Sequence, residues 1–97
     1  MTLTTNSTSV IQYIESKAGK IPATVMPQLL QSIEDGLESN FIEDAGIETI
    51  EQHLEDVMER LKISLDATKD YISTPQGKTA AKNVRYAIKL VNKTLSK

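Results

Sequence analysis

The sequence predicts an all-α fold: a small antiparallel four-helix bundle in which two short helices precede a long helical hairpin. The segment 46–73 carries this prediction, because it has no proline or internal glycine and its apolar residues recur every three or four positions. That spacing places them along one side of a helix. The 97-residue chain has no Cys, no Trp and one Phe. Its core must therefore be aliphatic, which suits helix-on-helix packing in a single domain, 1–97.

The first short helix is predicted over residues 7–18, after a polar start (1–6) that we expect to be frayed. An early Ser or Thr can cap this helix, and Gly19 beside two lysines is the expected ending. Its predicted apolar face consists of Val10, Ile11, Ile14 and Ala18.

The second short helix is predicted over residues 24–39. Thr24 is the expected N-cap, since Pro27 then falls in the first turn, where its missing N–H costs nothing. Gly36 interrupts the helix and is expected to weaken it by about 1 kcal/mol relative to Ala if its position is exposed. The predicted apolar face consists of Met26, Leu29, Leu30, Ile33 and Leu37.

The hairpin is predicted from two long helices, 47–73 and 75–96, the second with Thr74 as N-cap and Pro75 at its first position. An unbroken first helix would span ~39 Å, more than the ~30–35 Å width of a compact domain this size. We therefore expect an elongated molecule, or an end covered by a partner. The predicted apolar positions are Ile47, Ile50, Leu54, Val57, Met58, Leu61, Leu65 and Ile72 in the first helix, and Ala81, Val84, Ile88, Val91 and Leu95 in the second.

Charge separates the two parts of the chain. The net charge is −2, yet residues 74–97 contain six Lys or Arg and no acid, whereas residues 1–73 contain all 13 acids. Steps of three and four residues place the basic side chains of the last helix in one row, which we call the basic stripe: Lys78, Lys82, Arg85, Lys89 and Lys93. Such a row could contact the phosphates of a nucleic acid or an acidic partner. A solvated helix face is the simpler interpretation, because nucleic-acid readers usually carry a stronger basic signature.

Two further features invite a functional interpretation. Phe41 and Ile42 lie in the connection between the second and third helices, where they are expected to close one end of the bundle, with an apolar contact site as the alternative. His53 falls at the edge of an apolar stripe and could carry a phosphoryl group. Glu55 and Asp56 follow it closely, which is unfavourable for a phosphohistidine, so a structural role is the preferred interpretation.

The sequence predicts no enzyme. One His cannot supply the two Glu-x-x-His motifs of a di-metal bundle, nor a Ser–His–acid site in so acidic a setting. Gly77-Lys78-Thr79 matches only the end of a phosphate-binding loop and is better explained as a helix start. We therefore expect no cofactor, metal or small-molecule substrate. The acids of the central helix are expected to be solvated: Glu48, Glu51, Glu55, Glu59, Asp66 and Asp70.

The predicted function is that of a small, non-catalytic helical protein acting in protein–protein interaction or regulation. It would present helix faces to a protein partner or to itself, as a homo-oligomer such as a dimer, because a lean core gains from association. The first alternative is a nucleic-acid-associated protein that uses the basic stripe, and the second is phosphotransfer at His53. Since no apolar run approaches a membrane span and no secretion signal is recognisable, we expect a cytoplasmic protein.

Overall fold

The structure, a computed structural model, describes residues 6–40 and 47–96 and is all-helical over them. It contains α1 (Ser7–Ala18), α2 (Met26–Asn40), α3 (Ile47–Ala67) and α4 (Pro75–Leu95), with a short 3-10 helix, η1 (Thr68–Tyr71), after α3. The predicted all-α class and the four predicted helices are thereby confirmed. Local caps and turns fix where these helices begin and end.

Asn6, which the sequence analysis assigned to the frayed start, is the N-cap of α1. Its side-chain oxygen accepts the N–H of Ser9 at 2.9 Å, and its own N–H donates to the Ser9 hydroxyl at 3.1 Å. This reciprocal pair satisfies two backbone donors that the helix leaves unpaired. Gly19 ends α1 as predicted, with a φ of 95° that favours glycine over other residues.

The second helix begins at Met26, two residues later than predicted. The carbonyl of Pro22 accepts the N–H groups of both Val25 and Met26 at 3.0 Å, so the chain turns before the helix starts. Thr24 is exposed within this turn, and its prediction as N-cap is wrong. The turn buries Val25, which the helical spacing had not assigned to the core.

The third helix is shorter than the predicted 47–73, because its backbone tightens into η1 from Thr68. The Thr68 hydroxyl is buried with its side chain and donates to the carbonyl of Leu65 at 2.6 Å. Three residues per turn, in place of 3.6, rotate the following side chains away from the apolar stripe. Ile72, predicted as a core residue, is consequently 37% exposed.

Thr74 caps α4 as predicted, and its hydroxyl oxygen accepts the N–H of Gly77 at 3.0 Å. Thr74 also donates its N–H to the carbonyl of Tyr71 at 3.0 Å, which closes the turn between the two long helices. Gly77 is buried against that same carbonyl, so closely that a Cβ at this position would overlap the oxygen. The tight hairpin therefore depends on the missing side chain of Gly77.

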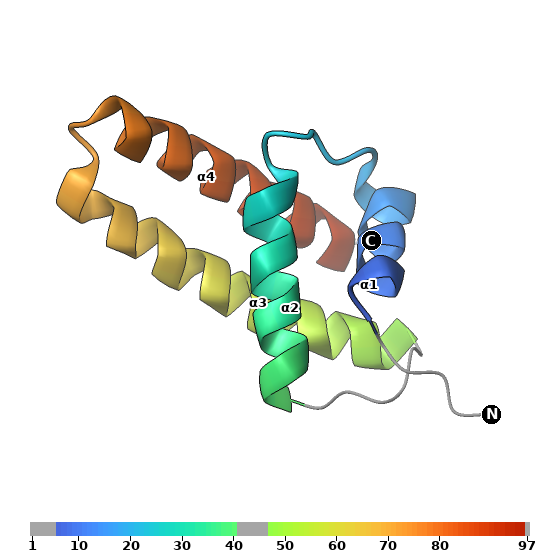
Figure 1. Ribbon diagram of the computed structural model, residues 1–97. Helices are drawn as coiled ribbons and strands as arrows, with labels where there is room; N and C mark the ends of the chain where they lie inside the picture. Colours follow the sequence, from blue (N-terminus) through green and yellow to red (C-terminus); the bar gives the residue numbers. More distant parts are fainter. Residues whose placement is uncertain (1–5, 41–46, 97) are drawn as a thin grey trace.

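The two long helices form an antiparallel hairpin, and α2 lies across it (Figure 1). α1 packs against α4 and α2, so the two short helices together cover one side of the hairpin. The molecule measures 49 × 26 × 21 Å and is elongated, as the length of the third helix predicted. One aliphatic core joins all four helices, and its fully buried members are Val10, Ile14, Leu29, Ile33, Leu54, Val57, Leu61, Ala87 and Val91.

We predict that Gly77→Ala destabilises the protein by about 1–3 kcal/mol, the usual cost of overpacking, because the added Cβ must displace the Tyr71 carbonyl. Urea unfolding followed by circular dichroism measures this change. Thr79→Ala, at an exposed position of the same helix turn, is the matched control and should shift stability by less than ~0.5 kcal/mol. Equal stability of the wild type and Gly77→Ala would contradict the steric account.

Candidate interaction surface

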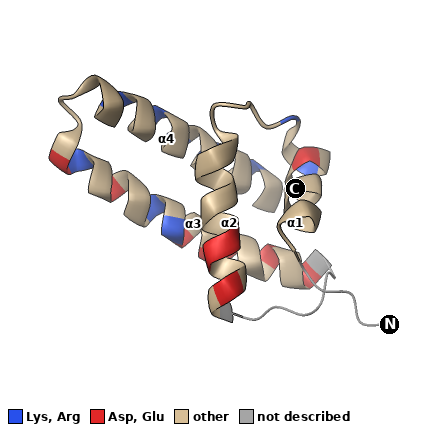
Figure 2. Ribbon diagram, viewed as in Figure 1, with Lys and Arg blue, Asp and Glu red and all other residues tan. Residues whose placement is uncertain are grey.

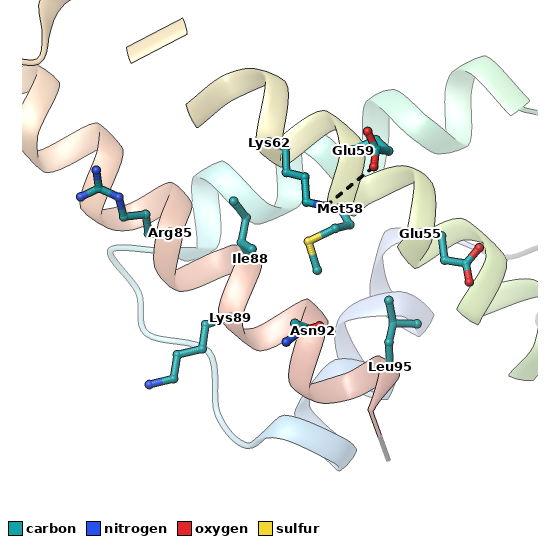
Figure 3. Close-up of a pocket in the computed structure, with 9 residues that line it drawn as sticks. All are labelled: Glu55, Met58, Glu59, Lys62, Arg85, Ile88, Lys89, Asn92 and Leu95. Carbon is teal, nitrogen blue, oxygen red and sulfur yellow. Dashed lines mark ion pairs between the residues drawn. The ribbon is translucent and has the colours of Figure 1, made fainter. Parts of the chain in front are cut away.

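The side of the hairpin that α1 and α2 leave open carries a groove of about 750 Å³ between α3 and α4. Figure 3 shows Met58 of α3 and Ile88 of α4 in the middle of this groove, with Leu95 at one end. All three apolar side chains are partly buried against the core. The groove therefore has an apolar floor that is continuous with the interior of the protein. We call it the hairpin groove.

The two walls of the hairpin groove differ in charge. The α3 wall consists of Glu55, Glu59 and Lys62, and the α4 wall consists of Arg85, Lys89 and Asn92. On the α3 wall the Lys62 ammonium lies 3.9 Å from the Glu59 carboxylate, a weak contact between two exposed groups (Figure 3). The α3 wall is thus net acidic, whereas the α4 wall is wholly basic or neutral.

The basic stripe lies on the surface of α4 over its whole length, and each of its five side chains is exposed. Figure 2 shows these basic positions along α4, while α3 carries both signs of charge and the end of α2 is acidic. Within the described residues, the ion pairs of the hairpin are all internal to α3 and η1, and none involves the stripe. Arg85 and Lys89 face the hairpin groove as lining residues, so the structure joins part of the predicted stripe to an apolar surface.

The other predicted contact residues, Phe41 and Ile42, lie outside the described residues. The six acids that were predicted to be solvated are all exposed, whereas Asp56 of the same helix is half-buried. Ile63, at 68% exposure, is the most exposed of the large apolar residues described, and it lies on the α2 side beside Arg60 and Ser64. Its position separates it from the hairpin groove.

His53 is 2% exposed, deeper than the edge position that the sequence indicated. Among the described residues, neither ring nitrogen has a hydrogen-bond partner of good geometry, and the carbonyl of Ile33 is near enough only to favour the charged ring weakly. An imidazole buried in this way is costly, and the cost is least when the ring is neutral. The ring fills space between α3 and α2, and no phosphoryl donor could reach it without opening that contact.

Gly36 of α2 provides the room for this ring. A Cβ on Gly36 would lie 2.6 Å from Cε1 of His53 and 2.8 Å from the Asp56 carboxylate, closer than packed atoms approach. Gly36 is buried, so the condition on which the sequence predicted a cost relative to Ala, an exposed position, is not met. The glycine is the small partner that lets α2 cross α3 over a large aromatic ring.

Burial lowers the pKa of His53 below its ordinary value of 6.5, because desolvation penalises the charged ring. The Asp56 carboxylate and the carbonyl of Ile33 oppose this effect, while the Arg60 guanidinium adds to the lowering. Arg60 Nε is paired with Asp56 at 2.7 Å, so the acid near the ring is already engaged. His53 is therefore held in its neutral form by its surroundings.

No group of three or more His, Cys, Asp or Glu able to hold a metal ion occurs in the part of the chain that the structure describes. Over the same residues, no helix has the length and apolar character needed to cross a membrane. Comparison with protein-family models, with curated proteins and with solved structures finds no match to this chain. The indications of function therefore come from the surface of the molecule.

The sequence analysis missed the hairpin groove, although it identified most of the residues concerned. Met58, Ile88 and Leu95 follow the core spacing and were assigned to the core, and the acids and bases were assigned to separate solvated faces. The related signal in the sequence is its charge asymmetry, which indicates a basic last helix after an acidic part of the chain but does not show that the two long helices line a groove.

We predict that the stability of the protein falls as the pH drops below about 6.5, before the carboxylates titrate. The unfolded chain protonates His53 near its ordinary pKa of 6.5, whereas the folded chain resists protonation, so the unfolded state binds more protons. The full contribution is present above pH 6.5 and is lost as the pH falls. Urea unfolding at intervals between pH 7.5 and 5 measures the slope.

The control for this experiment is His53→Leu, which replaces the ring with an apolar side chain that leaves no unpaired polar atom. Because His53 is the only His of the chain, this variant should lose the slope between pH 7 and 5. It should keep the neutral-pH stability of the wild type to within about 1.5 kcal/mol. A slope of equal size in both proteins would assign the pH dependence to other groups.

We also predict that Gly36→Ala destabilises the protein less when His53 is truncated. In the wild type the added Cβ overlaps the ring and the Asp56 carboxylate, which costs about 1–3 kcal/mol, of which better helix propensity recovers ~1 kcal/mol. In a His53→Ala background only the contact with the end of the Asp56 side chain remains, so Gly36→Ala should cost less than in the wild type. A double-mutant cycle by urea unfolding measures this coupling, and equal effects in both backgrounds would refute it.

Proposed function

We propose that this protein is a non-catalytic interaction protein that binds a protein partner, or a second copy of itself, through the hairpin groove. One observation carries the proposal: α1 and α2 cover one side of the hairpin, while the other side keeps an apolar floor between charged walls. An apolar centre with a polar rim is the usual anatomy of a protein–protein interface. Met58 and Ile88 form the centre of that floor.

A protein partner fits this surface better than a nucleic acid does. The basic stripe alone would attract phosphates, but Glu55 and Glu59 line the same groove as Arg85 and Lys89. Acidic side chains in the same groove weaken the positive potential that would attract a phosphate backbone. Phosphotransfer at His53 has no support from the geometry, because the ring is buried and its pKa is lowered by burial.

Site-specific photo-crosslinking tests the proposal. A photoreactive amino acid replaces Asn92, an exposed residue of the groove wall, and in a second protein it replaces Gln12, an exposed residue of α1. We predict discrete protein crosslinks from position 92 and not from position 12, in cells that produce the protein or in the purified sample. Mass spectrometry identifies the crosslinked chain.

Adding Ile88→Asp to the position-92 protein should remove the crosslinks, because a charge in the floor of the groove opposes burial by a partner. The helical circular dichroism signal of each variant confirms that it is folded. Crosslinks of equal yield from positions 92 and 12, or crosslinks to nucleic acid that nuclease removes, would overturn the proposal.

A further inference from the structure

The charges of the hairpin groove are arranged so that the surface is complementary to itself. In the antiparallel hairpin, Lys62 and Arg85 are the lining residues of each helix nearest the turn, and Glu55 and Asn92 lie toward the opposite end of the groove. Glu59 and Lys89 lie between them on opposite walls, beside the floor formed by Met58 and Ile88. Acid on one wall and base on the other, with an apolar strip between them, is a pattern that a rotated copy can match.

We propose that the hairpin groove binds a second copy of this chain in a two-fold symmetric dimer whose axis runs parallel to the hairpin. This inference rests on the proposed function and names its partner. Rotation by 180° about such an axis lays α3 of one copy over α4 of the other. Each Glu59 then faces Lys89 of the second copy, and Met58 and Ile88 of both copies meet near the axis.

The other face-to-face arrangement places the two-fold axis across the hairpin and lays α3 over α3. Glu55 and Glu59 would then face the same acids of the second copy, and the basic stripes would also meet. Like charges set against each other in an interface cost stability and suppress the arrangement. The charge distribution therefore selects one of the two symmetric dimers, in which four hairpin helices pack as a bundle.

The size of the open face limits the dimer interface. The helices of the hairpin have 21 residues each, or ~30 Å of length, and two helices side by side are ~20 Å wide. About 600 Å² of each copy is thus available, or roughly 1,200 Å² in total, at the lower end of specific interfaces. We expect a reversible dimer rather than an obligate one, because obligate interfaces are larger, on the order of 2,000 Å² or more.

One residue pair does not match the charge pattern. Lys62 is the only base on the α3 wall, and in the dimer it would face Arg85 of the second copy. The weak contact of Lys62 with Glu59 offsets the repulsion between these two bases only in part. The proposal therefore implies that Lys62→Glu tightens self-association, an effect that a dimer formed through any other surface would not show.

Sedimentation equilibrium or light scattering over a concentration series tests the proposal with charge reversals. Glu59→Lys and Lys89→Glu each create two like-charge contacts per dimer, so each should raise the Kd by ~10-fold or more. An equimolar mixture of these two variants should form a heterodimer, since every contact at these positions then joins Lys to Glu. The double variant Glu59→Lys/Lys89→Glu should dimerise with itself again.

Matched controls carry the same charge changes at exposed positions away from the groove: Glu34→Lys on α2 and Lys20→Glu before it. They should leave the Kd within about twofold, and circular dichroism should show wild-type helix content in every variant. Lys62→Glu should lower the Kd. Added salt should weaken the wild-type dimer, because its charge pairs lie at the rim.

Two outcomes would overturn the inference. A wild-type chain that stays monomeric up to about millimolar concentration excludes the dimer, although crosslinks from position 92 to another protein would leave the proposed function intact. A dimer that is insensitive to the reversals at Glu59 and Lys89, or one that the mixture does not restore, places the interface elsewhere. Association that requires nucleic acid, seen as excess absorbance at 260 nm, would also contradict a dimer formed through the hairpin groove.

Discussion

The aliphatic seam between α3 and α4 is the contact on which the rest of the structure depends. α1 and α2 have 12 and 15 residues, lengths at which an isolated helix is marginal in water. They become stable only by burying Val10, Ile14, Leu29 and Ile33 against a surface that already exists. The hairpin supplies that surface, and its own register is set by the tight turn in which Gly77 meets the Tyr71 carbonyl.

Local chemistry made much of this fold predictable. Helix ends that rest on a residue and its immediate neighbours were found, as with Gly19 and the Thr74–Pro75 start of α4. Features that depend on the balance between competing hydrogen bonds were not. The Pro22 carbonyl accepts two N–H groups, so α2 begins later along the chain than predicted. The change to a 3-10 helix at η1 turns Ile72 outward, which the periodic spacing did not predict either.

The candidate surface shows a different limit of sequence-based reasoning. Helical spacing correctly placed the basic stripe on one exposed face of α4. It could not show that Arg85 and Lys89 stand across a groove from Glu55 and Glu59, because that depends on the rotation of each helix about its own axis. The contact of Gly36 with His53 could not be predicted for the same reason. It depends on where α2 crosses α3, and the sequence of neither helix indicates that point.

The charge of α4 is not what a free solvated helix would favour. Lys78 and Lys82, Arg85 and Lys89, and Lys89 and Lys93 are like-charge pairs four residues apart, and such pairs destabilise a helix by a few tenths of a kcal/mol each. Acids interspersed along the same face would have removed this cost without touching the core. Among the described residues the α3 acids make no ion pair with the stripe, so the repulsion is not offset within the hairpin. Acidic groups brought against the hairpin groove would reduce it at Arg85 and Lys89, the two members of the stripe that line the groove.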